Sequence, residues 1–176
     1  MIYLLYGQPG SGKTVLGWLL AEELRTPFVI DGDEFREMFS NKNYGKKGRE
    51  ENIRNANAVA TYLNKKGKEG KWKAVYINDK ENSWKSHPIN KETDVVMSLV
   101  NPYKQLRKEL KENNTIYYED IWYKNEVVEI LLESDRDLRK NYHVNDFEDG
   151  NPDYVLNTDA DVEKTWEELK ILLDIN

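Results

Sequence analysis

Cysteine is absent from this sequence, and histidine occurs only as His87 and His143. Without cysteine the chain can form neither a disulfide nor a thiolate zinc site. The two histidines lie far apart in the sequence, which argues against a histidine metal cluster. No apolar stretch approaches the roughly 20 residues that a membrane-spanning helix needs. The first apolar run begins at residue 2 and leaves no room for a signal peptide, so we expect a cytoplasmic protein without a membrane partner.

The chain also lacks a large net charge of either sign, because its formal net charge at pH 7 is only −6. This balance argues against a surface that coats nucleic acid broadly, although it leaves room for a local basic groove. Hydrophobic residues make up 39% of the 176 residues, which is enough to bury a core. We therefore expect one domain over residues 1–176.

Residues 7–14 carry the phosphate-loop pattern G-x-x-x-x-G-K-T. An apolar, β-prone run precedes the pattern, and apolar residues at helical spacing follow it. A strand, a glycine loop and a helix N-terminus together direct backbone N–H groups and a helix dipole at phosphates. We expect Lys13 to act as a catalytic residue on the β- and γ-phosphates of ATP, and Thr14 to ligate Mg²⁺. The predicted nucleotide-binding residues are Gly7, Gln8, Pro9, Gly10, Ser11, Gly12, Lys13 and Thr14.

Strand-like and helix-like segments alternate along the chain, which predicts an α/β fold. Together with the phosphate loop, this pattern indicates a P-loop NTPase with three α/β/α layers and a mainly parallel sheet. The polar stretch 78–94 is long for a compact connection, so we interpret about 72–93 as an insertion. The predicted strands are 2–6, 28–30, 74–77, 95–100, 115–118 and 154–156, and the predicted helices are 15–24, 34–39, 50–66, 102–111, 127–132 and 162–173.

Two charged clusters follow the second strand. Asp33 lies at the carboxyl end of that strand, where open α/β sheets bind ligands. It can orient or deprotonate an acceptor hydroxyl, or hold Mg²⁺ through water, and Arg36 can bind an anionic acceptor. The alternative is that Asp31 and Asp33 only cap a helix.

The second cluster begins the helix after a polar loop over residues 40–49. Arg49 and Arg54 can bind phosphate or sulfate, and Asn52 can hydrogen-bond a base edge or a sugar hydroxyl. The alternative is a solvated helix start whose arginines pair with Glu50 and Glu51.

In their order, these motifs resemble the adenylylsulfate kinase (APS kinase) family. The family pattern continues the phosphate loop with D-G-D-x-x-R, R-x-x-N-I-R, a strand ending in S-P-Y, a lid, and N-P-[DE]-x-x-[IVL]-[DN]-T. This chain carries the matching segments 31–36, 49–54, 100–103 and 151–158. The resemblance covers nearly the whole chain apart from 72–93 and the lid.

The resemblance implies a kinase that moves the γ-phosphoryl group of ATP, with Mg²⁺, to the 3′-hydroxyl of adenylyl sulfate. The same resemblance implies that Asp33 orients the hydroxyl. It also implies a short lid at about 135–150, with Arg136 and Arg139 on its ATP side. A set of substrate residues would bind the small-molecule acceptor. That set is Asp33, Arg36, Arg49, Asn52, Asn101 and Pro102.

Three segments depart from the family pattern. The usual L-G-F-S segment, whose aromatic residue stacks on adenine, is shorter here and contains Tyr44. Asn101 replaces the serine of S-P-Y, and most of the family lid is missing. The departures indicate intact phosphoryl-transfer chemistry with altered acceptor recognition, in which Tyr44 or Phe147 supplies the stacking face.

Two alternative functions and the oligomeric state stay open. Polynucleotide kinases also pair G-x-P-G-S-G-K-[ST] with D-x-x-R, so a polynucleotide 5′-end or a modified nucleobase is another acceptor class. A basic groove would then come from lysines at 42, 46, 47, 65, 66, 68, 71 and 73. A nucleotide-binding protein without turnover is the second alternative, although an Asp-x-x-Arg acceptor site argues against it. The oligomeric state, including a homodimer, is the third open question.

Overall fold

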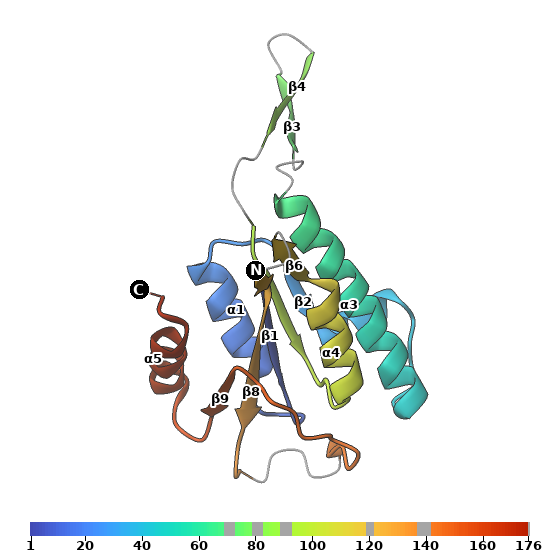
Figure 1. Cartoon of the computed structure of the whole chain (residues 1–176), viewed down its shortest axis with the longest axis vertical. Helices are drawn as coiled ribbons and strands as arrows, with labels where there is room; N and C mark the ends of the chain where they lie inside the picture. The colour runs from blue at the N-terminus through green and yellow to red at the C-terminus, as the bar shows by residue number, and fades with distance from the viewer. Residues whose placement is uncertain (69–72, 79–82, 89–92, 119–121, 137–141, 176) are drawn as a thin grey trace.

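The computed structural model describes residues 1–68, 73–78, 83–88, 93–118, 122–136 and 142–175. Its centre is a five-stranded sheet in the order β2-β5-β1-β8-β9, and every strand pair in it is parallel (Figure 1). The sheet strands are β1 (Ile2–Gly7), β2 (Val29–Asp31), β5 (Val95–Leu99), β8 (Val127–Glu133) and β9 (Tyr154–Asn157). The helices are α1 (Lys13–Glu23), α2 (Gly32–Met38), α3 (Lys46–Lys68), α4 (Lys104–Asn113) and α5 (Val162–Leu173).

Helices cover both faces of this sheet, because its strands are apolar on both sides. Ile2 and Leu4 of β1 pack in one hydrophobic cluster with residues of α3 and α4, such as Ala56 and Leu106. Leu5 points to the other face and joins a second cluster with residues of α1 and α5. Successive strand side chains alternate between faces, so one strand feeds both clusters. The predicted three-layer α/β/α P-loop fold is confirmed.

The predicted helix over 127–132 is wrong, because this segment forms strand β8. It pairs with β1 along Ile2↔Val127 to Gly7↔Leu132 and carries β9 on its other edge. Val127, Ile130 and Leu132 are all nearly inaccessible to solvent. A short continuous apolar run fits a buried parallel strand as well as a buried helix segment, and pairing with β1 decides between them.

Two predicted strands lie outside the central sheet. Segment 74–77 belongs to β3 (Lys73–Asn78), which pairs antiparallel with β4 (Ser83–Pro88) in a separate two-stranded sheet. Segment 115–118 is β6 (Thr115–Tyr118), which pairs with β7 (Trp122–Asn125) in the same way. Figure 1 shows the β3–β4 hairpin projecting beyond the end of α3.

Helix α3 begins at Lys46, four residues before the predicted start at residue 50. Its first turn is bonded through Arg49 N to Gly45 O at 3.0 Å. The early start shortens the polar loop after α2 and brings Arg49 into the first turns of the helix. Among the described residues, no helix is long and apolar enough to cross a membrane.

Candidate active site

The phosphate loop connects β1 to α1 and requires glycine for its backbone path. Gly10 and Gly12 have φ angles of 89° and 85°, in the left-handed region that favours glycine. A Cβ on Gly7 would lie 2.3 Å from the Leu132 carbonyl oxygen of β8, so the loop also packs too closely for a side chain. No side chain caps the N-terminus of α1, whose first N–H groups are therefore available to an anion.

Lys13 begins α1 and folds back over the loop. Its Nζ donates to the Gln8 carbonyl oxygen at 2.6 Å and to Ser11 Oγ at 3.3 Å. The Lys13 carbonyl in turn accepts from Ser98 Oγ of β5 at 3.0 Å. The ammonium group is thus held beside the loop at the carboxyl ends of β1 and β5.

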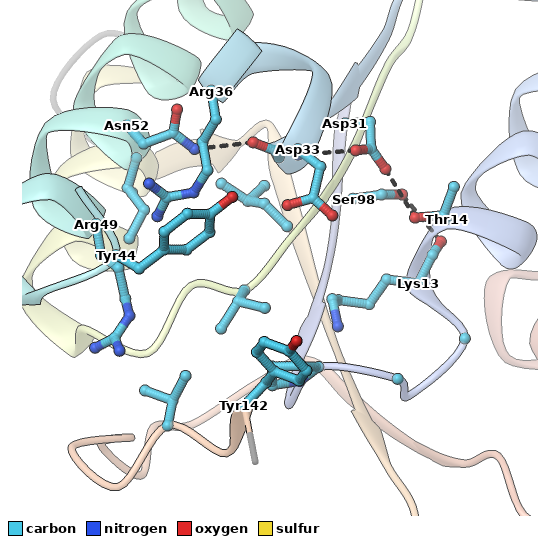
Figure 2. A pocket seen from close by; sticks show the side chains of 18 of the residues that line it. Lys13, Thr14, Asp31, Asp33, Arg36, Tyr44, Arg49, Asn52, Ser98 and Tyr142 are labelled. Carbon is cyan, nitrogen blue, oxygen red and sulfur yellow. Dashed lines mark hydrogen bonds between the residues drawn. The ribbon is translucent and has the colours of Figure 1, made fainter. Parts of the chain in front are cut away.

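Asp31 and Asp33 have different surroundings. Asp31 is buried at the end of β2, where it accepts from the Thr14 hydroxyl at 2.7 Å and from the Asp33 backbone N–H at 2.9 Å. It also caps α2 through the Glu34 N–H, so the capping alternative holds for Asp31. The Asp33 side chain is exposed, and Figure 2 shows its carboxylate facing the Lys13 side chain across the cavity.

These groups line a cavity of about 930 Å³ at the carboxyl edge of the sheet. The wall opposite the phosphate loop comes from α2, the loop after it, and α3. The Arg36 guanidinium lies 4.6 Å from the centre of the Tyr44 ring, and Arg36 Nη1 donates to the Asn43 carbonyl oxygen at 3.0 Å. Partial burial lowers the pKa of the Arg36 guanidinium from its ordinary value. Asn52 is buried and donates to the Gly32 carbonyl oxygen at 3.1 Å, which ties α3 to α2.

Arg49 lies on the same wall and is held by two side chains. Its Nη1 donates to Asp146 Oδ1 at 3.1 Å and to the Tyr103 hydroxyl at 3.4 Å. The Tyr103 hydroxyl donates to Asp146 Oδ2 at 2.9 Å. Burial raises the pKa of Tyr103, and Arg49 and Asp146 act on that pKa in opposite directions.

Several predicted site residues do not line the cavity. Asn101 and Pro102 are buried behind it in the segment after β5. Arg136 forms an ion pair with Asp159 at 3.4 Å and donates to the Thr158 carbonyl oxygen, away from the cavity wall. Arg139 lies outside the described residues.

Of the two predicted stacking residues, Tyr44 lines the cavity, whereas Phe147 does not. Phe147 stacks on Tyr6 with ring centres 6.2 Å apart and packs against the buried core. The Tyr44 side chain is 66% exposed and presents its ring to the cavity.

The sequence prediction missed one wall of the cavity, formed by Tyr142, His143 and Val144. The Gln8 side chain holds this wall, because Gln8 Nε2 donates to the Val144 carbonyl and the Val144 N–H donates to Gln8 Oε1, both at 3.0 Å. No motif marks these residues; the only sequence signal is that they lie within the predicted short lid at about 135–150. We call residues 142–148 the strap.

Comparisons with known proteins matched a family model and several solved structures. The family model for zeta toxin matches residues 1–84, which contain the phosphate loop, Asp33 and Arg36. No curated protein matches the chain.

Solved structures match nearly the whole chain. The APS kinase CysC of Mycobacterium tuberculosis, solved with AMPPNP and APS, is 18% identical with a TM-score of 0.66, over 98% of this chain and 96% of that one. A gluconokinase from Sinorhizobium meliloti 1021 is 14% identical with a TM-score of 0.57, over 98% and 90%. A sugar kinase from Janibacter sp. HTCC2649 is 14% identical with a TM-score of 0.59, over 99% and 94%. The chain is thus a P-loop NTPase by its fold. Its fold is the one found in these APS kinase, gluconokinase and sugar kinase structures.

Proposed function

We propose that this protein is an ATP-dependent kinase that transfers the γ-phosphoryl group to a hydroxyl of a small anionic acceptor. The observation that carries the proposal is that one cavity contains both halves of such a site. Lys13 and Thr14 line it from the phosphate loop, and Asp33, Arg36 and Arg49 line it from α2 and α3. A phosphate-binding protein without an acceptor has no use for the second set of residues.

The residues present fit ATP and Mg²⁺. Uncapped N–H groups at the start of α1, with Lys13 beside them, suit the β- and γ-phosphates. Thr14 and Asp31 offer a hydroxyl and a carboxylate, 2.7 Å apart, to one cation. Mg²⁺ commonly takes one or two protein oxygens and fills its remaining positions with phosphate and water oxygens. The bound ion would neutralise charge on the transferring group.

Asp33 is the group we assign to the acceptor hydroxyl. In the transfer, the acceptor oxygen forms a bond to the γ-phosphorus while the bond from that phosphorus to the β,γ-bridging oxygen breaks. The proton of the hydroxyl passes to the Asp33 carboxylate, which faces Lys13 across the cavity (Figure 2). Asp31 is less suited to this role, since both its oxygens already accept hydrogen bonds.

Adenylyl sulfate is the acceptor we propose, with its 3′-hydroxyl as the reacting group. The exposed Tyr44 ring offers a stacking face for adenine, and Arg36 offers guanidinium donors to the phosphate–sulfate group. The structural likeness to an APS kinase solved with APS adds support. Because both Asn101 and Pro102 are buried, neither is assigned an acceptor contact.

The test is a transfer assay with γ-labelled ATP and Mg²⁺ against adenylyl sulfate, gluconate and a 5′-hydroxyl oligonucleotide in parallel. We expect label on adenylyl sulfate, and none when Lys13 is replaced by alanine. Lys164→Ala on α5, outside the cavity, is the matched control and should keep wild-type turnover.

Each other outcome has its own meaning. Label on gluconate alone would support the kinase activity but show that the acceptor is gluconate and not adenylyl sulfate. Label on the oligonucleotide alone would show a polynucleotide kinase. ATP binding without transfer to any acceptor would contradict the proposed activity.

A further inference from the structure

Arg36 and Arg49 form the wall of the cavity that is proposed to bind the acceptor. The carboxylate of Asp146 already contacts Arg49 of this wall. Asp146 uses both its oxygens: Oδ1 accepts from Arg49 at 3.1 Å and Oδ2 accepts from the Tyr103 hydroxyl at 2.9 Å. A group with two oxygens that accept from a guanidinium and a phenol has the hydrogen-bonding character of a sulfate, phosphate or carboxylate ligand. Asp146 therefore occupies the Arg49 guanidinium, a donor that an acceptor anion could also use, and the Tyr103 hydroxyl holds Asp146 in this position.

Asp146 reaches Arg49 from a different element of the site, although Asp146 itself does not line the cavity. It belongs to the strap, whose residues Tyr142 and Val144 line the cavity and which Gln8 fastens to the phosphate loop. Arg49 belongs to α3, which carries the opposite wall (Figure 2). The ion pair thus joins the strap to α3, and both elements carry residues that line the cavity.

The ion pair is exposed enough to exchange. The side chain of Asp146 is 43% accessible and that of Arg49 is 22% accessible. Ion pairs with this degree of solvent contact contribute little to stability, so a ligand anion can replace one partner. While the pair is intact, the Asp146 charge offsets that of Arg49 and leaves Arg36 as the main cationic group on this wall.

We propose that Asp146 is a specificity-determining residue that competes with the acceptor's anionic group for Arg49. An acceptor must bring an oxyanion able to replace a carboxylate already in position, and a neutral acceptor gains nothing from Arg49. This inference rests on the proposed function, since it takes the Arg49 wall as the acceptor side.

The first test compares Asp146→Asn with Asp149→Asn by steady-state kinetics on adenylyl sulfate. Each variant removes one negative charge, and the two positions are three residues apart. Unlike Asp146, the Asp149 carboxylate makes no hydrogen bond or ion pair within the described part of the chain. Asp146→Asn should lower the KM for the acceptor about two- to fivefold, the size expected when a half-exposed ion pair no longer competes. The kcat and the KM for ATP should stay at wild-type values, and Asp149→Asn should change nothing.

The second test needs no turnover and so separates this inference from the proposed activity. Inorganic sulfate is titrated by calorimetry into wild type, Asp146→Asn, Arg49→Gln and the double variant. Asp146→Asn should tighten sulfate binding about two- to fivefold when Arg49 is present, and should have no such effect when it is combined with Arg49→Gln. The phosphate loop contributes equally to all four proteins and cancels in the comparison.

Tyr103→Phe provides an independent check, because it removes the hydroxyl that holds Asp146 Oδ2 and keeps the ring. It should shift acceptor KM and sulfate affinity in the same direction as Asp146→Asn, by less. A weaker affinity in Asp146→Asn would show that Asp146 positions Arg49 rather than competing for it, and would overturn the inference. An equal change in Asp149→Asn, or a change that persists without Arg49, would overturn it as well. If no acceptor is phosphorylated, the sulfate titration decides alone.

Discussion

Two aspartates only two residues apart have different surroundings at the end of β2. Asp31 is buried and bonded to Thr14 and to the first turn of α2, so its position is fixed from two sides. Asp33 is exposed in the first turn of the same helix and lines the cavity. The D-G-D-x-x-R motif predicted Asp33 as the residue that acts on an acceptor, and this role stays a prediction. The sequence could not predict the contact between Thr14 and Asp31, because no local motif links residues 17 positions apart.

The first prediction concerns Asp33. Asp33→Asn should lower kcat by about 10²- to 10⁴-fold, because an amide cannot accept the hydroxyl proton. ATP affinity should stay near the wild-type value, since Asp31 and Thr14 are untouched. Glu34→Gln is the matched control, one residue further along α2 and outside the cavity lining. A comparable loss of ATP affinity with little loss of kcat would move Asp33 to a metal-holding role.

At the scale of elements, the strap lies within the lid predicted at about 135–150, but its contacts with the rest of the site could not be predicted from the sequence. Arg36, Asp33 and the phosphate loop could be predicted because each lies in a local motif with a physical reason for its spacing. The Gln8–Val144 and Arg49–Asp146 contacts join residues 136 and 97 positions apart and follow no such spacing. The wrong prediction for β8 has the same cause. The run Val127–Leu132 has no periodicity that separates a strand from a helix, and its partner residues in β1 lie 125 positions away in the sequence.

The second prediction concerns the bond between the strap and the phosphate loop. Gln8→Ala removes both hydrogen bonds to the Val144 backbone. Hydrogen exchange at the Val144 amide should accelerate by about tenfold or more, because each such bond contributes about 1 kcal/mol. The melting temperature should change little. Asn145→Ala, an exposed neighbour in the strap, should leave the Val144 exchange rate as it is; similar rates in Gln8→Ala and wild type would show that other contacts hold the strap.

For the molecule as a whole, one buried acid should shape how stability depends on pH. Glu129 of β8 is 4% exposed, and burial raises its pKa above the ordinary value of 4.5 despite Lys111 at 3.7 Å. Above 4.5 and up to the raised pKa, the folded protein holds this proton more tightly than the unfolded chain does. The free energy of unfolding should therefore fall as pH rises through that window.

The third prediction follows from this sign. Glu129→Gln should flatten the fall of melting temperature with rising pH above 4.5, because the amide does not ionise. Glu133→Gln, an exposed position on the same strand, should keep the wild-type pH profile. Thermal melts of the three proteins between pH 4 and 8 provide the measurement, and parallel profiles in all three would assign the pH dependence to other groups.

The fourth prediction concerns the β3–β4 hairpin. Its two strands pair with each other and with no other strand that the structure describes. Replacing residues 74–87 by a short glycine-rich turn should therefore leave the melting temperature within a few degrees of wild type and the transfer rate unchanged. A large drop in either would show that the segment is part of the domain's core or site, and would contradict its interpretation as an insertion.

The short contact between Lys13 Nζ and the Gln8 carbonyl, 2.6 Å in length, has a consequence for how the two substrates influence each other. In the proposed kinase, Lys13 turns from this carbonyl toward the phosphates when ATP binds, and Gln8 also fastens the strap that carries Asp146. Nucleotide and acceptor should then be coupled in affinity, and thermodynamic linkage makes that coupling reciprocal. Bound ADP and Mg²⁺ should change the dissociation constant of adenylyl sulfate by some factor, and bound adenylyl sulfate should change the dissociation constant of ADP by the same factor. Gln8→Ala should bring both factors toward one.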